Sequence, residues 1–158
     1  QVYSCGLIHD IGKLAKLKYD QENFCVELNR AEESKLNNHQ IEITQNGIRH
    51  DVLGGEICKE WGISPLIGAV AKWHHELERS KRLDVEDLET HKIIDVVQFS
   101  NEMMKEIEFG FSGHNVKLTP SSRIMRRLKM SENDVDEFKI KLVQELEQEK
   151  ENIAFFTS

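Results

Sequence analysis

The sequence predicts an all-α fold, a helical bundle built as one domain over residues 1–158. Proline and glycine are scarce, with 2 and 9 residues, whereas a sandwich or barrel needs many turns. Charged residues make up 31% of the chain, which is typical of helices that present broad charged faces beside narrow apolar stripes. Apolar residues also recur every three to four positions in most segments, and this period indicates helix.

The first expected helix covers residues 2–17, where apolar residues at helical intervals surround His9 and Asp10. The pattern then dissolves into polar and charged residues. Over residues 18–40 we therefore expect an irregular connection with at most one short helix.

A second expected helix covers residues 50–61. The next helix has the clearest start in the chain, with Ser64 placed as an N-cap and Pro65 at the first helical position. It continues to His74 and His75.

The remaining elements follow from charge, turn residues and capping. They are an exposed charged loop over 76–89, a long helix over 90–107, a turn over 110–114, a short helix over 123–128 and a closing amphipathic helix. Ser131 and Asp134 form a variant of the capping box at the start of that last helix.

Charge and cysteine content limit the expected partners and location. The net charge of −7 disfavours nonspecific binding to nucleic acid or to an anionic membrane. The short basic run from Arg123 to Lys129 is interpreted as a solvated helix face, and a nucleic-acid-binding module has no other support. No apolar stretch approaches the roughly 20 residues that cross a bilayer. Three cysteines without metal-ligand spacing indicate reduced thiols and a cytoplasmic protein.

Several segments supply candidate metal ligands in apolar helical contexts. These are His9 with Asp10, His50, His74 with His75, and Asn101. Imidazole nitrogens together with a carboxylate suit a divalent first-row metal such as iron, manganese or zinc. One histidine alone is more often a hydrogen-bonded core residue, but several in such settings favour a site, and we expect these side chains to converge in one pocket.

At these positions the sequence resembles a known superfamily. The run GLIHDIGK, which contains His9, Asp10 and Lys13, is similar to the signature of HD-domain metal phosphohydrolases. The run EITQNGIRHDVLGGEICKEWGISPLIGAVAKWHHE resembles more specifically the HDOD branch. The resemblance implies an HD-domain-like helical bundle in which the His-Asp pair binds metal and the aspartate can bridge two ions. It also implies that Lys13 faces phosphate oxygens and that Asp10 and Lys13 serve catalysis where the site is active.

The sequence departs from the superfamily pattern at two ligands. The relatives carry a first ligand histidine well before the His-Asp pair, whereas this chain begins at Gln1, so we expect a fragment without the N-terminal helices. Asn101 stands where the last ligand is usually an aspartate, and an amide is a weaker ligand than a carboxylate. Asp95 is expected to face away from the site. Any metal should therefore be weakly held.

Other residues are assigned by the same comparison. The glycine-rich signature of cyclic di-GMP hydrolases does not follow His75, so that activity is not supported. For Glu42 we favour capping of the helix that holds His50 over metal contact. Trp61 and Trp73 are expected in the core, and the remaining histidines, His39, His91 and His114, on the surface.

Two functions follow from the resemblance. The first is a bacterial signal-transduction module that acts by binding a protein partner or an attached signalling domain. The second is a metal-dependent phosphohydrolase, a phosphodiesterase or phosphomonoesterase with a phosphate-containing small molecule as its ligand. There a metal-bound hydroxide attacks phosphorus and Lys13 steadies the leaving charge. Asn101 and the missing first histidine favour the regulatory module.

Overall fold

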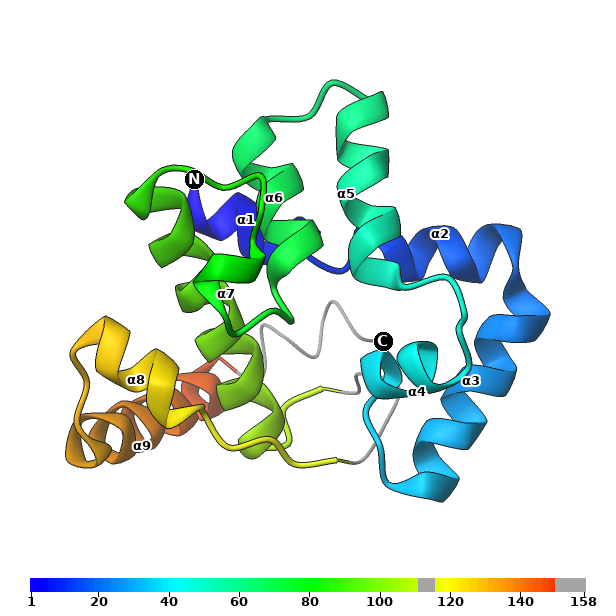
Figure 1. Ribbon diagram of the computed structural model, residues 1–158. Coiled ribbons are helices and arrows are strands. Elements are labelled where there is room, and N and C mark those ends of the chain that lie inside the picture. The colour runs from blue at the N-terminus through cyan, green and yellow to red at the C-terminus, as the bar shows by residue number, and fades with distance from the viewer. Residues whose placement is uncertain (111–115, 150–158) are drawn as a thin grey trace.

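The computed structural model describes residues 1–110 and 116–149, and these residues form helices and no strand, as Figure 1 shows. The predicted all-α class is confirmed. The helices are α1 (Val2–Ile8), α2 (Ile11–Tyr19), α3 (Gln21–Ser34), α4 (Asn38–Thr44), α5 (His50–Glu60), α6 (Pro65–Trp73), η1 (Arg79–Lys81), α7 (Leu88–Glu106), α8 (Ser122–Leu128) and α9 (Glu132–Gln148).

The first predicted helix is in fact two, because the chain bends between α1 and α2. Asp10 has φ −100° and ψ 17°, values outside the helical region, and α2 starts only after it. Two adjacent residues on one straight helix point in directions about 100° apart. The bend allows His9 and Asp10 to face the same centre.

The prediction of an irregular connection over residues 18–40 is wrong. A 14-residue helix, α3, occupies most of it, and α4 follows behind a capping box at Asn37. The apolar period is faint because α3 buries only Phe24, Glu27 and Ala31. One of these three is a carboxylate, so the buried face of α3 does not give the apolar periodicity that predicts a helix.

Helices α2, α5 and α6 pack closely and hold the centre of the molecule. Pro65 is the first residue of α6, as predicted. A Cβ added to Gly12 in α2 would lie 1.9 Å from the carbonyl oxygen of His50. The backbones of α2 and α5 therefore touch at the residue that starts α5, and only glycine fits there.

Helix α7 links two parts of the core. Its first half packs with α1 and α6 in a cluster of Cys5, Val70, Ile93, Ile94 and Val97, and its second half packs with α8 and α9 in a cluster of Phe99, Met103, Ile124 and Val135. Figure 1 shows α8 and α9 at the far end of α7 from α1 and α6. The capping box predicted at Ser131 and Asp134 is present, with both reciprocal hydrogen bonds.

The segment over 76–89 is less exposed than predicted, since it contains η1 and buries Arg82. Arg82 Nη2 lies 2.8 Å from Asp95 Oδ1, and both side chains are fully buried. Arg79 and Arg127 complete the ion pairs around Asp95. Asp95 is therefore held by two arginines of this segment and by Arg127 of α8.

The two tryptophans differ. Trp73 packs against the first core cluster, but Trp61 is 70% exposed, so its predicted core position is wrong. It lies just after the last turn of α5, beyond the reach of α6. None of the described helices has the length and apolar character needed to cross a bilayer.

Candidate metal centre

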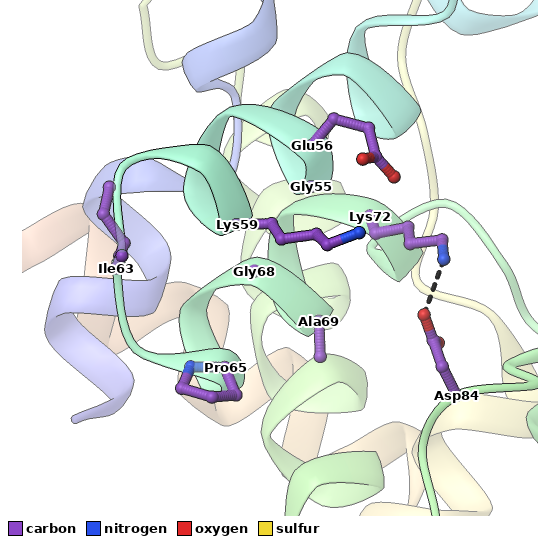
Figure 2. A pocket seen from close by; sticks show the side chains of 10 residues that line it. Gly55, Glu56, Lys59, Ile63, Pro65, Gly68, Ala69, Lys72 and Asp84 are labelled. Atoms are coloured by element: carbon purple, nitrogen blue, oxygen red, sulfur yellow. Dashed lines mark hydrogen bonds and ion pairs between the residues drawn. The ribbon is translucent and has the colours of Figure 1, made fainter.

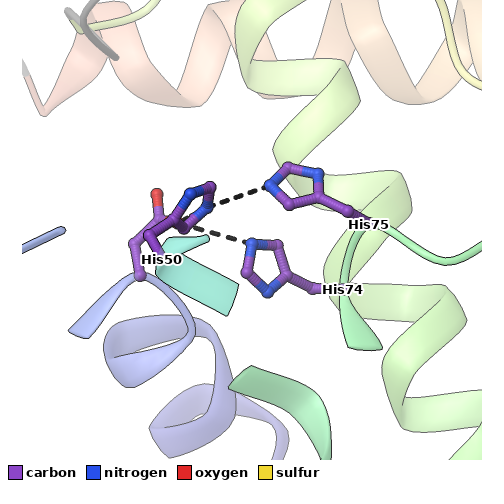
Figure 3. Close-up of side chains that lie close together, drawn as sticks. His50, His74 and His75 are labelled. Atoms are coloured by element: carbon purple, nitrogen blue, oxygen red, sulfur yellow. Dashed lines mark hydrogen bonds and ion pairs between the residues drawn. The ribbon is translucent and has the colours of Figure 1, made fainter. Parts of the chain in front are cut away.

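The site lies where the ends of several helices meet. His9 and Asp10 stand between α1 and α2, His50 opens α5, and His74 and His75 follow the last turn of α6. Ligand-capable atoms of Asp10, His50, His74 and His75 all lie within 4.8 Å of one another. Figure 3 shows the imidazole rings of the three histidines close together, with His50 edge-on to His75 and the ring of His74 tilted against both.

The separations between these atoms fit one metal ion. The Nε2 atoms of His50 and His75 are 3.1 Å apart, and Asp10 Oδ1 lies 3.2 Å from His50 Nε2 and 3.4 Å from His74 Nε2. Ligands that each lie about 2.1 Å from a zinc-like ion are separated from one another by about 3.0 to 3.4 Å. Three of the six atom pairs in the cluster therefore have the spacing of neighbouring metal ligands.

Hydrogen bonds on the far side of the rings set which nitrogen faces the cluster. The Nδ1 atoms of His9, His50 and His74 donate to the Gly6 carbonyl at 2.6 Å, to Glu42 at 2.7 Å and to the Ala71 carbonyl at 2.8 Å. These acceptors carry no proton, so Nδ1 must be the donor. In a neutral ring Nε2 then carries the lone pair, which is the form that binds metal.

Several of the inward-facing atoms lack any hydrogen bond. His9 Nε2, His74 Nε2 and Asp10 Oδ1 are buried without a partner among the described residues. Unpaired buried polar atoms are rare and cost free energy, and lone pairs that face a carboxylate oxygen repel it. A cation between them removes both penalties. The donor set therefore fits a divalent metal.

The charges also suit a cation. Burial raises the pKa of Asp10, but the neighbouring His50 and His74 rings and Lys13 outweigh it and hold that pKa well below its usual range. Burial lowers the pKa of His74 to about 4 and holds that of His75 well below normal. Both rings are thus neutral at pH 7 while Asp10 is charged. Burial lowers the pKa of His50, but Asp10 and Glu42 outweigh it and raise that pKa, because two carboxylates favour a positive charge between them.

His9 stands at the edge of this group. Its Nε2 is 3.4 Å from Asp10 Oδ2, and its ring meets that of His74 edge-on with centroids 4.9 Å apart. His9 is thus adjacent to the four-residue cluster without belonging to it, and its role as a ligand stays a prediction.

Glu42 acts on His50 as the sequence comparison favoured. Its Oε2 accepts the backbone N–H that opens α5 at 3.1 Å as well as the Nδ1 proton. Glu42 is not among the four clustered residues. It therefore caps α5 and orients the histidine rather than facing the cluster.

Two histidines expected on the surface are buried or half-buried. The ring of His39 stacks on His75 with centroids 4.2 Å apart and planes 20° apart, and its Nε2 lies 3.2 Å from Asp51 Oδ2. His91 is only 8% exposed on α7. Both surface predictions are wrong, because each histidine is covered by residues distant in the sequence, and the local apolar pattern does not reveal such contacts. His114 lies outside the described residues.

Two lysines place positive charge beside the cluster. Lys13 Nζ donates to Asp10 Oδ2 at 2.7 Å. Lys105 on α7 is close enough to Lys13 and Asp10 for their charges to interact, and burial lowers its pKa to about 8. Asn101 is half-buried one helical turn before Lys105. Asn101 thus shares the α7 face of Lys105, and its role as a ligand stays a prediction.

Two hollows lie away from the cluster. One, of about 500 Å³ between α5 and α6, is drawn in Figure 2, where Lys72 and Asp84 form an ion pair at its edge. The other is a larger groove of about 920 Å³ along α2 and α5. It is mainly apolar and includes Leu14, Ile48, Leu53, Ile57 and Trp61.

The fold and cluster together define an all-helical domain with a His/Asp site whose geometry fits a divalent cation. The model of the family described as HDOD domain matches residues 1–77, and this match supports the predicted HDOD branch of the HD-domain superfamily. The match covers His9, Asp10, His50, His74 and His75. Comparisons with curated proteins and with solved structures gave no match.

Proposed function

We propose that this chain is a bacterial, cytoplasmic signal-transduction module that holds one divalent cation at the cluster and acts by binding a protein partner. The observation that carries the proposal is that the two carboxylate oxygens of Asp10 have different partners. Oδ2 is hydrogen-bonded to Lys13, and Oδ1 faces His50 and His74. A carboxylate that binds two ions through separate oxygens must offer both, and here one oxygen already accepts a hydrogen bond from Lys13.

The other nearby carboxylates are also engaged. Glu42 binds His50 and Lys16, and Asp95 binds three arginines. Among the described residues, the cluster thus contains one carboxylate and three neutral or singly protonated rings. Such a donor set compensates the charge of one divalent ion, with iron, manganese and zinc all compatible.

The groove along α2 and α5 supports partner binding. Leu14, Ile48 and Trp61 are 62%, 61% and 70% exposed there. Contiguous exposed apolar side chains mark protein contact surfaces. Asp20, Glu56 and Glu60 also line the groove, whereas Lys18 is the exposed base. An amphipathic helix with basic flanks, from a separate protein or an attached domain, matches this surface.

The metal content of untagged protein tests the cation. After purification without a histidine tag, elemental analysis should give up to one ion per chain, and calorimetry with manganese or zinc should give a one-site isotherm. Two ions per chain, or none after incubation with excess metal, would contradict a one-ion centre.

A second experiment tests the partner surface independently of metal. The Trp61→Glu change places a charge in the groove at an exposed position, so the fold should tolerate it. Affinity capture with the unaltered chain and with this variant, followed by mass spectrometry, should show partners that bind through the groove and are lost on substitution. The Ile140→Glu change in α9 is the matched control, since Ile140 is 60% exposed far from the groove. Equal recovery by all three chains would contradict this surface.

A metal-dependent phosphohydrolase is the second candidate, and the two lysines favour it. Lys13 and Lys105 supply positive charge next to Asp10, where phosphate oxygens of a bound small molecule would lie. A bound ion would supply an activated water and polarise the phosphoryl group. Hydrolysis of a generic phosphodiester and of cyclic dinucleotides with added manganese or iron is the test. Turnover that disappears in a His74→Ala variant would replace the regulatory proposal with this one.

A further inference from the structure

Lys16 is a buried lysine on the same helix as the motif lysine Lys13, and it has no part in the site as described so far. Its side chain is 3% exposed. Its Nζ donates to Glu27 Oε2 at 2.5 Å, to Glu42 Oε1 at 2.6 Å and to the carbonyl oxygen of Ile48 at 2.8 Å. All three protons of the ammonium group are therefore used.

The Glu42 carboxylate connects Lys16 to His50. Its Oε1 accepts from Lys16 and, at 3.3 Å, from Asn38 Nδ2. Its Oε2 accepts both the backbone N–H and Nδ1 of His50. Each oxygen thus has its own set of donors, and Lys16 fixes the rotation of the carboxylate that presents Oε2 to the histidine.

We infer that Lys16 is a positioning residue for His50, acting through Glu42, and that it holds the His50 ring with Nδ1 toward Glu42 and Nε2 toward the cluster. This inference rests on the proposed function, because that nitrogen matters as a metal ligand. Glu27 is the second carboxylate bound to Lys16, and its charge balances that of the ammonium group. Lys16, Glu27 and Glu42 together carry a formal charge of −1, which faces the Nδ1–H of the imidazole.

The physical reason lies in the two tautomers of histidine. With Oε2 held in place, the proton stays on Nδ1 and Nε2 keeps its lone pair. Without the ammonium group, Oε1 loses its strongest donor and the carboxylate can rotate. The ring then also adopts the tautomer with the proton on Nε2, which blocks the ligand atom.

The test compares Lys16→Met, which keeps an unbranched apolar stem, with Lys16→Arg, which keeps the charge. The control is Lys139→Met, which removes a 2.6 Å ion pair with Glu106 between α9 and α7. Histidine ring ¹⁵N spectra of metal-free protein, recorded at a pH above the raised pKa of His50 where its ring is neutral, report the tautomer directly. We expect His50 protonated on Nδ1 in the parent chain, in Lys139→Met and largely in Lys16→Arg, and a mixture of tautomers in Lys16→Met.

Removal of Lys16 alone leaves Glu27 as a buried unpaired charge, which can prevent folding. The double change Lys16→Met with Glu27→Leu removes both charges and should give the same mixture of tautomers. Manganese or zinc affinity should fall in step, by about 10- to 100-fold, which is usual for the loss of an outer-shell partner. An unchanged His50 tautomer in either folded variant would overturn the inference.

The spectra of metal-free protein separate this inference from the proposed function. If the parent chain binds no metal, the one-ion proposal fails, but the His50 tautomer still decides the role of Lys16. If the parent chain binds metal and the Lys16 variants keep both tautomer and affinity, the inference alone fails.

Discussion

Gly12 and the carbonyl oxygen of His50 meet so closely that a Cβ at Gly12 would lie 1.9 Å from that oxygen. This contact places the start of α5 directly against the helix that follows the His-Asp pair. Because both partners are backbone, neither can move aside without moving a whole helix. The position of His50 in the cluster thus depends on the absence of one side chain.

A Gly12→Ala change should therefore separate α2 from α5. We expect a loss of unfolding free energy of about 3 kcal/mol, at the upper end of typical overpacking costs, and a lower metal affinity. Urea unfolding measures the first and calorimetry the second. Gly6→Ala is the control, because a Cβ there meets nothing within 4 Å and alanine favours helix. If the Gly12→Ala chain were as stable as the Gly6→Ala chain, α2 and α5 could move apart at little cost in free energy, contrary to this prediction.

His74 should be needed for metal binding but not for the fold. Its Nε2 is buried without a hydrogen bond and faces Asp10 Oδ1. We expect His74→Ala to lower manganese or zinc affinity at least about 100-fold, since one ligand of a small donor set is lost. His91→Ala removes a buried histidine from α7 outside the cluster and should leave the affinity unchanged. Equal losses in the two variants would mean that the histidines serve only the packing.

The buried ion pair of Arg82 and Asp95 predicts a large stability effect. Both side chains have no exposed surface, and Arg82 also binds the carbonyl oxygens of Glu76 and His91. An Arg82→Leu change removes the donor of the Glu76 carbonyl and leaves Asp95 Oδ1, among the described residues, with only the 3.4 Å contact to Arg127, and we expect a loss of about 3 to 5 kcal/mol. Urea unfolding of this variant is compared with Lys141→Ala, whose exposed pair with Glu145 should contribute less than about 0.5 kcal/mol. A loss below about 1 kcal/mol for Arg82→Leu would contradict the buried network.

Sequence patterns predicted the elements whose signals are local. Ser64, Pro65 and the Ser131 capping box mark helix starts within a few residues, and the HD motif places His9 and Asp10 together. Contacts between distant segments could not be predicted in this way.

Helix α3 shows why. Its buried Glu27 makes sense only beside Lys16, 11 residues earlier, and this pairing leaves no trace in the apolar period. His39 resembles a surface residue in a polar segment until α4 brings it against His75. The bend at Asp10 likewise has no turn residue to mark it, and α1 packs on α6 whereas α2 packs on α5.

Lys105 should bind an anion if the site holds phosphate. Its ammonium group makes no hydrogen bond or ion pair with any described residue, although its charge interacts with those of Asp10 and Lys13. With manganese present, we expect Lys105→Ala to weaken pyrophosphate binding about 5- to 20-fold, which corresponds to the loss of one charge-assisted contact. Isothermal titration measures it, and Lys92→Ala at the exposed start of α7 is the control. Identical pyrophosphate affinities in both variants would exclude Lys105 from an anion site.

Asn101 provides the last prediction, because it decides whether one residue separates this module from an enzyme. An amide oxygen is neutral, whereas an aspartate at the same place on α7 adds a second carboxylate to the single one of Asp10. We expect Asn101→Asp to raise manganese or iron affinity by about 10-fold and to give measurable hydrolysis of a generic phosphodiester where the parent chain gives little. The added charge also strengthens the hold on the ion that must activate water.

The control for this gain is Ser100→Asp, which adds the same charge to the neighbouring, exposed position of α7. It should change neither affinity nor turnover, because its side chain points away from the Lys105 face. The combination of Asn101→Asp with His74→Ala should lose whatever activity Asn101→Asp gains. If Asn101→Asp and Ser100→Asp behave alike, Asn101 does not face the cluster, and the missing activity has another cause than this one carboxylate.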